Sequence, residues 1–190
     1  MGELYISIDV ETDGPIPGPN SMLSLGAVAL TPRGVNLGEF EINFEELEGA
    51  SGNPDTMAWW AKQPKEIWDA CRREPKHPQV AMRQFASWIN DLAEEHHLTP
   101  VCVAYPAGFD FMFVYWYLMR FLGKSPFSFS CLDIKTYTMA TLKLPYRQST
   151  KKNMPREWFK DLPPHEHIAC SDAREQGLLF LNILRHNVHR

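Results

Sequence analysis

The stretch "LYISIDVETDG", Leu4 to Gly14, begins as a β-strand and ends in carboxylates. Its first residues, Leu4 to Ile8, are mostly bulky and apolar, which is typical of a buried central strand. Asp9, Glu11 and Asp13 follow, although acidic residues are poor strand formers and are costly to bury. Asp9 and Glu11 are two residues apart, so their side chains point to the same face of the strand. The stretch therefore predicts a buried strand whose end presents two carboxylates.

The elements expected along the rest of the chain place this strand in a mixed sheet. Two more strands follow it closely and would complete an antiparallel meander. Helices then alternate with two short strands, an order typical of an α/β domain. The expected strands are Leu4–Ile8, Met22–Leu30, Val35–Phe44, Val101–Tyr105 and Phe127–Ile134; the expected helices are 56–73, interrupted near Pro64, 79–96, 109–123 and 172–188. The polar, proline-punctuated tract 142–164 is expected to be a long loop.

Composition narrows the class of protein. The chain has 190 residues, 44% of them apolar, which is enough for one domain, 1–190, with a substantial core. Its net charge of -4 gives no general polyanion-binding surface, so nucleic-acid binding would depend on a local patch or on metal ions. Four widely spaced cysteines without a CxxC pair indicate reduced thiols in a cytoplasmic protein. We expect neither a secretory signal nor a membrane-spanning segment.

Three further residues could join the two strand acids in one site. Asp110 opens an apolar helix after "AYPAGF", and Asp172 opens the last helix with His167 five residues before it. Taken singly, each has an ordinary explanation, because aspartate is a common N-cap and a histidine before a helix is usually a loop residue. The "HEH" sequence at 165–167 could also indicate a separate transition-metal site, but no further ligands accompany it. The combination of all five residues is harder to explain in this ordinary way.

These residues lie in motifs that resemble those of the DnaQ-like, DEDDh-type 3′–5′ exonucleases. "SIDVETDG" resembles the first exonuclease motif, "AGFDFMFV" the second, and "HIACSDAREQ" the third; "MLSLGAV" resembles the family's second strand. The motifs fall in the family's order and span Leu4 to Gln176. The resemblance implies a ribonuclease-H-like fold, with a mixed sheet flanked by helices, and metal-dependent removal of nucleotides from a 3′ end. One departure is Pro106, where the second motif often carries asparagine.

The chemistry of this family accounts for acids at the end of a buried strand. Phosphodiester hydrolysis needs an activated water and neutralisation of developing charge, and two hard cations about 4 Å apart supply both. Carboxylates hold such ions, and Mg²⁺ also binds substrate phosphate. By the resemblance, Asp9 would bridge two Mg²⁺ ions, with Glu11 and Asp172 on the first and Asp110 on the second. Mn²⁺ could substitute for Mg²⁺.

The resemblance also gives roles to residues around the metals. His167 would be the general base, a role that suits an imidazole with an unperturbed pKa near 6.5. Thr12 and its backbone N–H would bind the terminal 3′-hydroxyl of the substrate. Trp59 and Trp60 could stack on bases, but adjacent helical residues point about 100° apart, so we expect at most one to do so, and core packing is the favoured role for these side chains. The tract from Lys143 to Lys160 holds six basic residues and one acid, which fits either a solvated loop or a phosphate-contacting flap.

The expected function is a 3′–5′ exonuclease that shortens single-stranded RNA from its 3′ end and releases nucleoside 5′-monophosphates. RNA is favoured over DNA because "MAWWAKQ" resembles a branch containing bacterial exoribonucleases. Two alternatives remain: the same enzyme acting on DNA in repair or proofreading, and a catalytically silent nucleic-acid-binding module on the same fold. The presence of all five catalytic residues argues against silence. Relatives are often dimers, so a homodimer is also left open.

Overall fold

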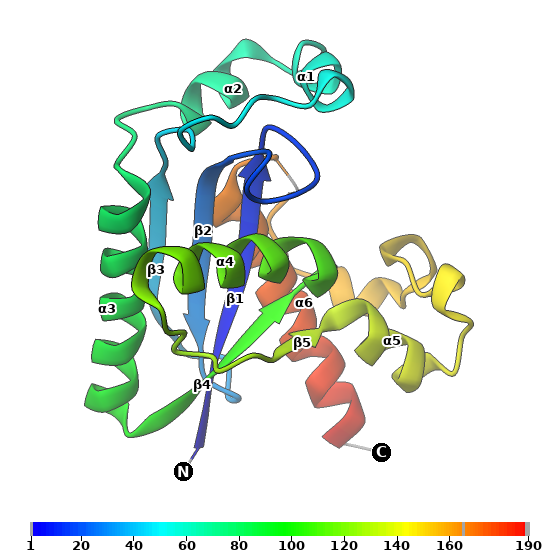
Figure 1. The fold of residues 1–190 in the computed structure, drawn as a ribbon. Helices are drawn as coiled ribbons and strands as arrows, with labels where there is room; N and C mark the ends of the chain where they lie inside the picture. The colour runs from blue at the N-terminus through cyan, green and yellow to red at the C-terminus, as the bar shows by residue number, and fades with distance from the viewer. Residues whose placement is uncertain (1, 165, 189–190) are drawn as a thin grey trace.

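The computed structural model describes residues 2–164 and 166–188, and its central feature is a five-stranded sheet in the order β3-β2-β1-β4-β5 (Figure 1). Strands β1, β2 and β3 form an antiparallel meander, whereas β4 and β5 run parallel to β1. The predicted mixed sheet is therefore confirmed. The strands are β1 (Gly2–Thr12), β2 (Met22–Leu30), β3 (Asn36–Asn43), β4 (Leu98–Ala104) and β5 (Cys131–Asp133); the helices are α1 (Pro54–Trp60), α2 (Lys65–Cys71), α3 (Pro78–His96), α4 (Ala107–Leu122), α5 (Ile134–Leu142) and α6 (Ala169–Val188).

Helices cover both faces of the sheet and divide its core into two. On one face α3 and α4 pack on apolar side chains of β1 and β2, and on the other face α6 crosses the same strands (Figure 1). Alternation along β1 produces this division, because Ile6 and Ile8 join the α3–α4 core while Tyr5 joins the α6 core. By the same alternation Asp9 and Glu11 face α6.

Strand β1 extends beyond its parallel neighbour β4. The last pair between them is Ser7 with Val103, whereas β1 remains paired with β2 as far as Thr12. From residue 8 onward, one edge of β1 is therefore free of β4, although it still needs partners for its backbone groups. The Val10 N–H donates to Asp110 Oδ1 at 3.4 Å, so α4 supplies one of those partners together with a carboxylate.

Two glycines let α6 approach the sheet closely. A Cβ on Gly26 would lie 2.1 Å from the backbone carbon of Ala169, and a Cβ on Gly177 would lie 2.8 Å from the Cβ of Ser7. Gly26 pairs with Asp9 across the β1–β2 ladder. The start of α6 is therefore held against the sheet beside the acids of β1.

The structure corrects the sequence expectations in the C-terminal half. The strand expected over 127–134 is limited to β5, because Ser128 adopts a left-handed backbone with φ of 57°. Helix α5 was not predicted; its N-cap is Asp133, whose Oδ1 accepts the Thr136 N–H at 2.6 Å. The loop expected after it is confirmed, with three short 3₁₀ helices, Tyr146–Gln148, Lys151–Asn153 and Arg156–Phe159.

Helix α6 begins at Ala169, which places Asp172 within the first turn rather than at the cap. Across residues 2–164 and 166–188, no helix combines the length and hydrophobicity needed to cross a bilayer.

Candidate active site

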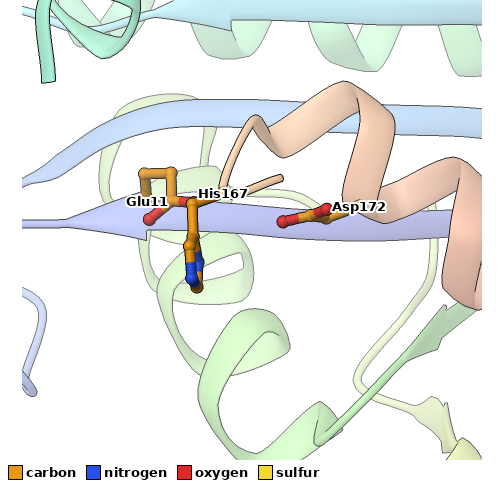
Figure 2. Close-up of side chains that lie close together, drawn as sticks. All are labelled: Glu11, His167 and Asp172. Atoms are coloured by element: carbon orange, nitrogen blue, oxygen red, sulfur yellow. The ribbon is translucent and has the colours of Figure 1, made fainter. Parts of the chain in front are cut away.

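Three predicted site residues meet at the end of β1. Glu11 of β1 and Asp172 of α6 are 8% and 2% exposed, and the half-buried His167 lies in the segment before α6. One ligand atom from each of these three side chains lies within 4.8 Å of the others, which is close enough to share a metal ion (Figure 2). The structure thus brings together groups that are 156 and five residues apart in the sequence.

The segment before α6 is shaped by the helix that follows it. Asp172 Oδ1 accepts the backbone N–H of Glu166 at 2.9 Å, which ties this segment to the first turn of α6. His167 adopts a left-handed backbone with φ of 55°, so the chain turns sharply at this position. Together these features place the imidazole beside the Glu11 and Asp172 carboxylates. His165, the other histidine of "HEH", lies outside the described residues.

Asp9 and Asp110 complete the acidic group. Asp9 is half-buried, and Gln176 of α6 donates through Nε2 to Asp9 Oδ1 at 3.3 Å and to the Ile8 carbonyl at 2.6 Å. Asp110, 4% exposed in the first turn of α4, reaches β1 through the Val10 N–H. All four predicted acids therefore lie around the free edge of β1.

The pKa values of Asp9, Glu11 and Asp110 are all raised. Burial, followed by repulsion from Asp110, Glu11 and Asp172, raises the pKa of Asp9 well above its usual value. Burial, with repulsion from Asp172 and Asp110, raises the pKa of Glu11 to about 8. Burial likewise raises the pKa of Asp110 to about 7. A bound divalent cation would relieve this repulsion, and carboxylate oxygens are the ligands that Mg²⁺ prefers, so the donor set fits the metals that the sequence implies.

The structure separates the two tryptophans expected near the substrate. Trp59 is 39% exposed, and its ring centroid lies 5.3 Å from that of His167 with the planes at 84°. Trp60 is 4% exposed, and its indole N–H donates to the Thr12 carbonyl at 2.9 Å. Trp60 is therefore packed into the protein and supports the end of β1, in line with the core-packing role and with the expectation that at most one of the two rings faces a base. Thr12 is itself buried, and its hydroxyl donates to the Gly14 carbonyl at 2.9 Å.

Two residues beside the acids were missed from the sequence. Gln176 belongs to the third motif, and it lies one turn after Asp172. This spacing puts both side chains on one helix face and could have indicated a place for Gln176 beside the acids. Lys151 was one of six basic residues in a loop, and no local pattern distinguishes it from the others. Its Nζ forms an ion pair with Glu175 of α6.

A mixed sheet of this order, with four acids and a histidine at the end of its first strand, defines a ribonuclease-H-like nuclease. The chain belongs to the 3′–5′ exoribonuclease Rv2179c-like domain family, whose sequence model matches residues 4–184. It is also similar to the 3′–5′ DNA exonuclease Cap18 of Escherichia coli, with 32% identity over 179 residues covering 94% of this chain and 90% of that protein. The predicted DEDDh-type 3′–5′ exonuclease is thereby confirmed.

Solved structures of exonucleases share the fold. The nuclease domain of 3′hExo, a DEDDh family member bound to rAMP, superposes with a TM-score of 0.62 at 12% identity, covering 99% of this chain and 91% of that one. A zinc-bound complex of E. coli ExoI with single-stranded DNA gives a TM-score of 0.60 at 15% identity, covering 95% of this chain and 39% of that one. The ribonuclease-H-like fold expected from the motifs is confirmed.

Proposed function

We propose that this exonuclease removes nucleotides one at a time from the 3′ end of single-stranded RNA and releases nucleoside 5′-monophosphates. The observation that carries the proposal is the meeting of Glu11, His167 and Asp172 within 4.8 Å at the end of β1. Asp9 and Asp110 would complete a ligand set for two Mg²⁺ ions, with Mn²⁺ able to substitute. Bound there, the ions would polarise the scissile phosphate and lower the pKa of the attacking water.

The chain's own residues have distinct tasks in this proposal. The His167 imidazole accepts the proton of the attacking water. The exposed face of Trp59 stacks on the terminal base, since aromatic rings bind bases without sequence preference. The Thr12 hydroxyl is engaged with Gly14, so contact with the terminal sugar falls to the backbone of Thr12 and to Glu11.

Both RNA and DNA are candidate substrates. RNA is supported by the family description, and DNA by the name of the E. coli relative. Matched 5′-labelled RNA and DNA oligomers with Mg²⁺ or Mn²⁺ test them directly. We expect a ladder of products that shortens from the 3′ end, faster for RNA, and blocked by a 3′-phosphate. Faster cleavage of DNA would replace RNA with DNA, no cleavage of either would favour the silent binding module, and immediate release of the 5′ label would contradict the proposed polarity.

Metal binding should depend on pH because it must displace protons from the acids. Glu11 and Asp110, with pKa values of about 8 and about 7, hold more protons in the metal-free folded protein than in the unfolded chain between about pH 4.5 and those values. Stability falls with rising pH wherever the folded state binds more protons, so the metal-free melting temperature should drop by about 5 °C or more from pH 5 to pH 8. Saturating Mg²⁺ should remove most of this drop.

Calorimetry in buffers of different ionisation enthalpy measures how many protons the protein releases when it binds Mg²⁺. At pH 7 we expect net release of protons on Mg²⁺ binding, reduced in Glu11→Gln and unchanged in Glu94→Gln, which removes an exposed acid of α3. Metal binding without proton release would show that these acids are already ionised in the metal-free protein, and the raised pKa values would be wrong.

A further inference from the structure

A pocket of about 400 Å³ opens on the Asp9 side of the site. Asp9 and Asp172 line one part of it, and Tyr105 and Lys151 line another. This volume lies within the range of small-ligand pockets. The pocket is therefore continuous with the carboxylates of the active site and large enough to receive part of a substrate.

Lys151 is fixed in this pocket by a buried partner. Its Nζ pairs with Glu175, whose side chain is 7% exposed, and lies 5.5 Å from the centroid of the Tyr105 ring. A buried carboxylate that loses its partner is strongly destabilised, so Glu175 holds the ammonium in place. The Lys151 side chain is 31% exposed, so the cation is the accessible end of the pair. An ammonium has three N–H donors, which leaves it able to bind a further anion.

The position of the pocket along β1 indicates which anion. His167 lies near Glu11, at the end of the strand, and Trp59 lies beside His167. Asp9 is two residues earlier, about 6.6 Å back along the strand. A nucleic-acid strand whose terminal nucleotide lies at Trp59 would place its preceding nucleotide on the Asp9 side.

We propose that this pocket is the subsite for the second nucleotide from the 3′ end, and that Lys151 binds the phosphate on the 5′ side of that nucleotide. The inference rests on the proposed function, because it takes the direction of the strand from it. Glu175 is then a positioning residue, which acts by holding Lys151 over Tyr105. The opposite interpretation is that the ion pair only anchors the 142–164 loop to α6.

Dinucleotides with and without a 5′-phosphate distinguish the two interpretations. They differ only in the phosphate that Lys151 is proposed to bind, and both ribose and deoxyribose pairs are used so that sugar preference does not matter. We expect Lys151→Gln to lower the ratio of kcat/KM for the phosphorylated over the unphosphorylated dinucleotide by about tenfold, mainly through KM, since a charge-assisted hydrogen bond is lost. In Lys151→Arg the ratio should stay close to the wild-type value. Lys152 is an exposed neighbour, so Lys152→Gln should leave the ratio unchanged.

A double variant controls for folding. Lys151→Gln alone leaves Glu175 buried without its cation, whereas Lys151→Gln with Glu175→Gln restores neutrality and should melt close to the wild type. We expect the double variant to show the same loss of ratio. An unchanged ratio in the double variant, or an equal loss for both dinucleotides, would overturn the subsite and leave Lys151 as a loop anchor.

Binding of the same dinucleotides, measured in Ca²⁺ by competition with a fluorescent oligomer, separates this inference from the proposed function. If the wild type hydrolyses no dinucleotide or oligomer, the proposed function fails. In that case the subsite is supported only if Lys151→Gln selectively weakens binding of the phosphorylated dinucleotide. It is contradicted if the variant binds the phosphorylated and unphosphorylated dinucleotides as the wild type does.

Discussion

Asp172→Asn is expected to lower kcat by about 10³-fold or more while the protein remains folded. The carboxylate would hold a catalytic metal, whose stabilisation of transition-state charge amounts to several kcal/mol, and each 1.36 kcal/mol corresponds to tenfold in rate. The amide oxygen of asparagine can still accept the Glu166 N–H, so the segment carrying His167 should keep its position. Single-turnover hydrolysis of a 3′-terminal oligomer at saturating Mg²⁺ measures the loss directly.

Two further measurements keep this result interpretable. Asp91→Asn removes an exposed acid on α3 and should leave kcat unchanged. The Mg²⁺-induced rise in melting temperature should shrink in Asp172→Asn and also in Asp9→Asn. Near-normal turnover by Asp172→Asn at saturating Mg²⁺ would remove the two-metal proposal, and an unchanged thermal response in both variants would place the metal site elsewhere.

The acids of β1 could be predicted because their positions follow from local rules. A strand fixes the direction of every second side chain, so Asp9 and Glu11 had to share a face once the apolar run before them was recognised. The order of strands and helices likewise indicated the mixed sheet. These features depend on spacing within a few residues, which the sequence contains explicitly.

The way in which α4 and α6 come together with β1 at the site depends on tertiary contacts that no local sequence pattern shows. The close approach of α6 to the sheet requires Gly26 on β2 and Gly177 on α6, and the sequence does not show that these two residues lie at the contacts. The free edge of β1, which Asp110 occupies, arises because β4 stops pairing after Ser7. Such features follow from tertiary packing rather than from propensity.

Burial and tertiary contacts distinguish residues of the same type whose roles the sequence left open. Trp59 and Trp60 are identical in chemistry, yet one is 39% exposed beside His167 and the other is 4% exposed beneath Thr12. Lys151 is set apart from the other basic residues of its loop by its pairing with Glu175, a partner contributed by α6. In both cases the tertiary environment, rather than the side chain, separates an accessible group beside the acids from a structural or solvated one.

His167→Ala is expected to lower kcat by about 10²–10⁴-fold, the range for loss of a positioned general base. Only a neutral imidazole accepts a proton, so the wild-type rate should rise with pH where histidine titrates, and the variant should lose that rise. Single-turnover rates between pH 6 and 8 measure both effects. His96→Ala, an exposed histidine at the end of α3, is the matched control.

Proximity alone allows a second role for His167, because its ring lies within 4.8 Å of ligand atoms of Glu11 and Asp172 and could itself hold the metal. The two roles make opposite predictions for metal affinity. A general base leaves Mg²⁺ binding by His167→Ala close to wild type, and Mg²⁺, a hard cation, prefers the oxygen ligands that remain. The cavity left by the imidazole should also let added imidazole restore part of the rate. A metal affinity that falls as far as in Asp172→Asn, with no rescue by imidazole, would make His167 a ligand and assign the proton transfer to another group.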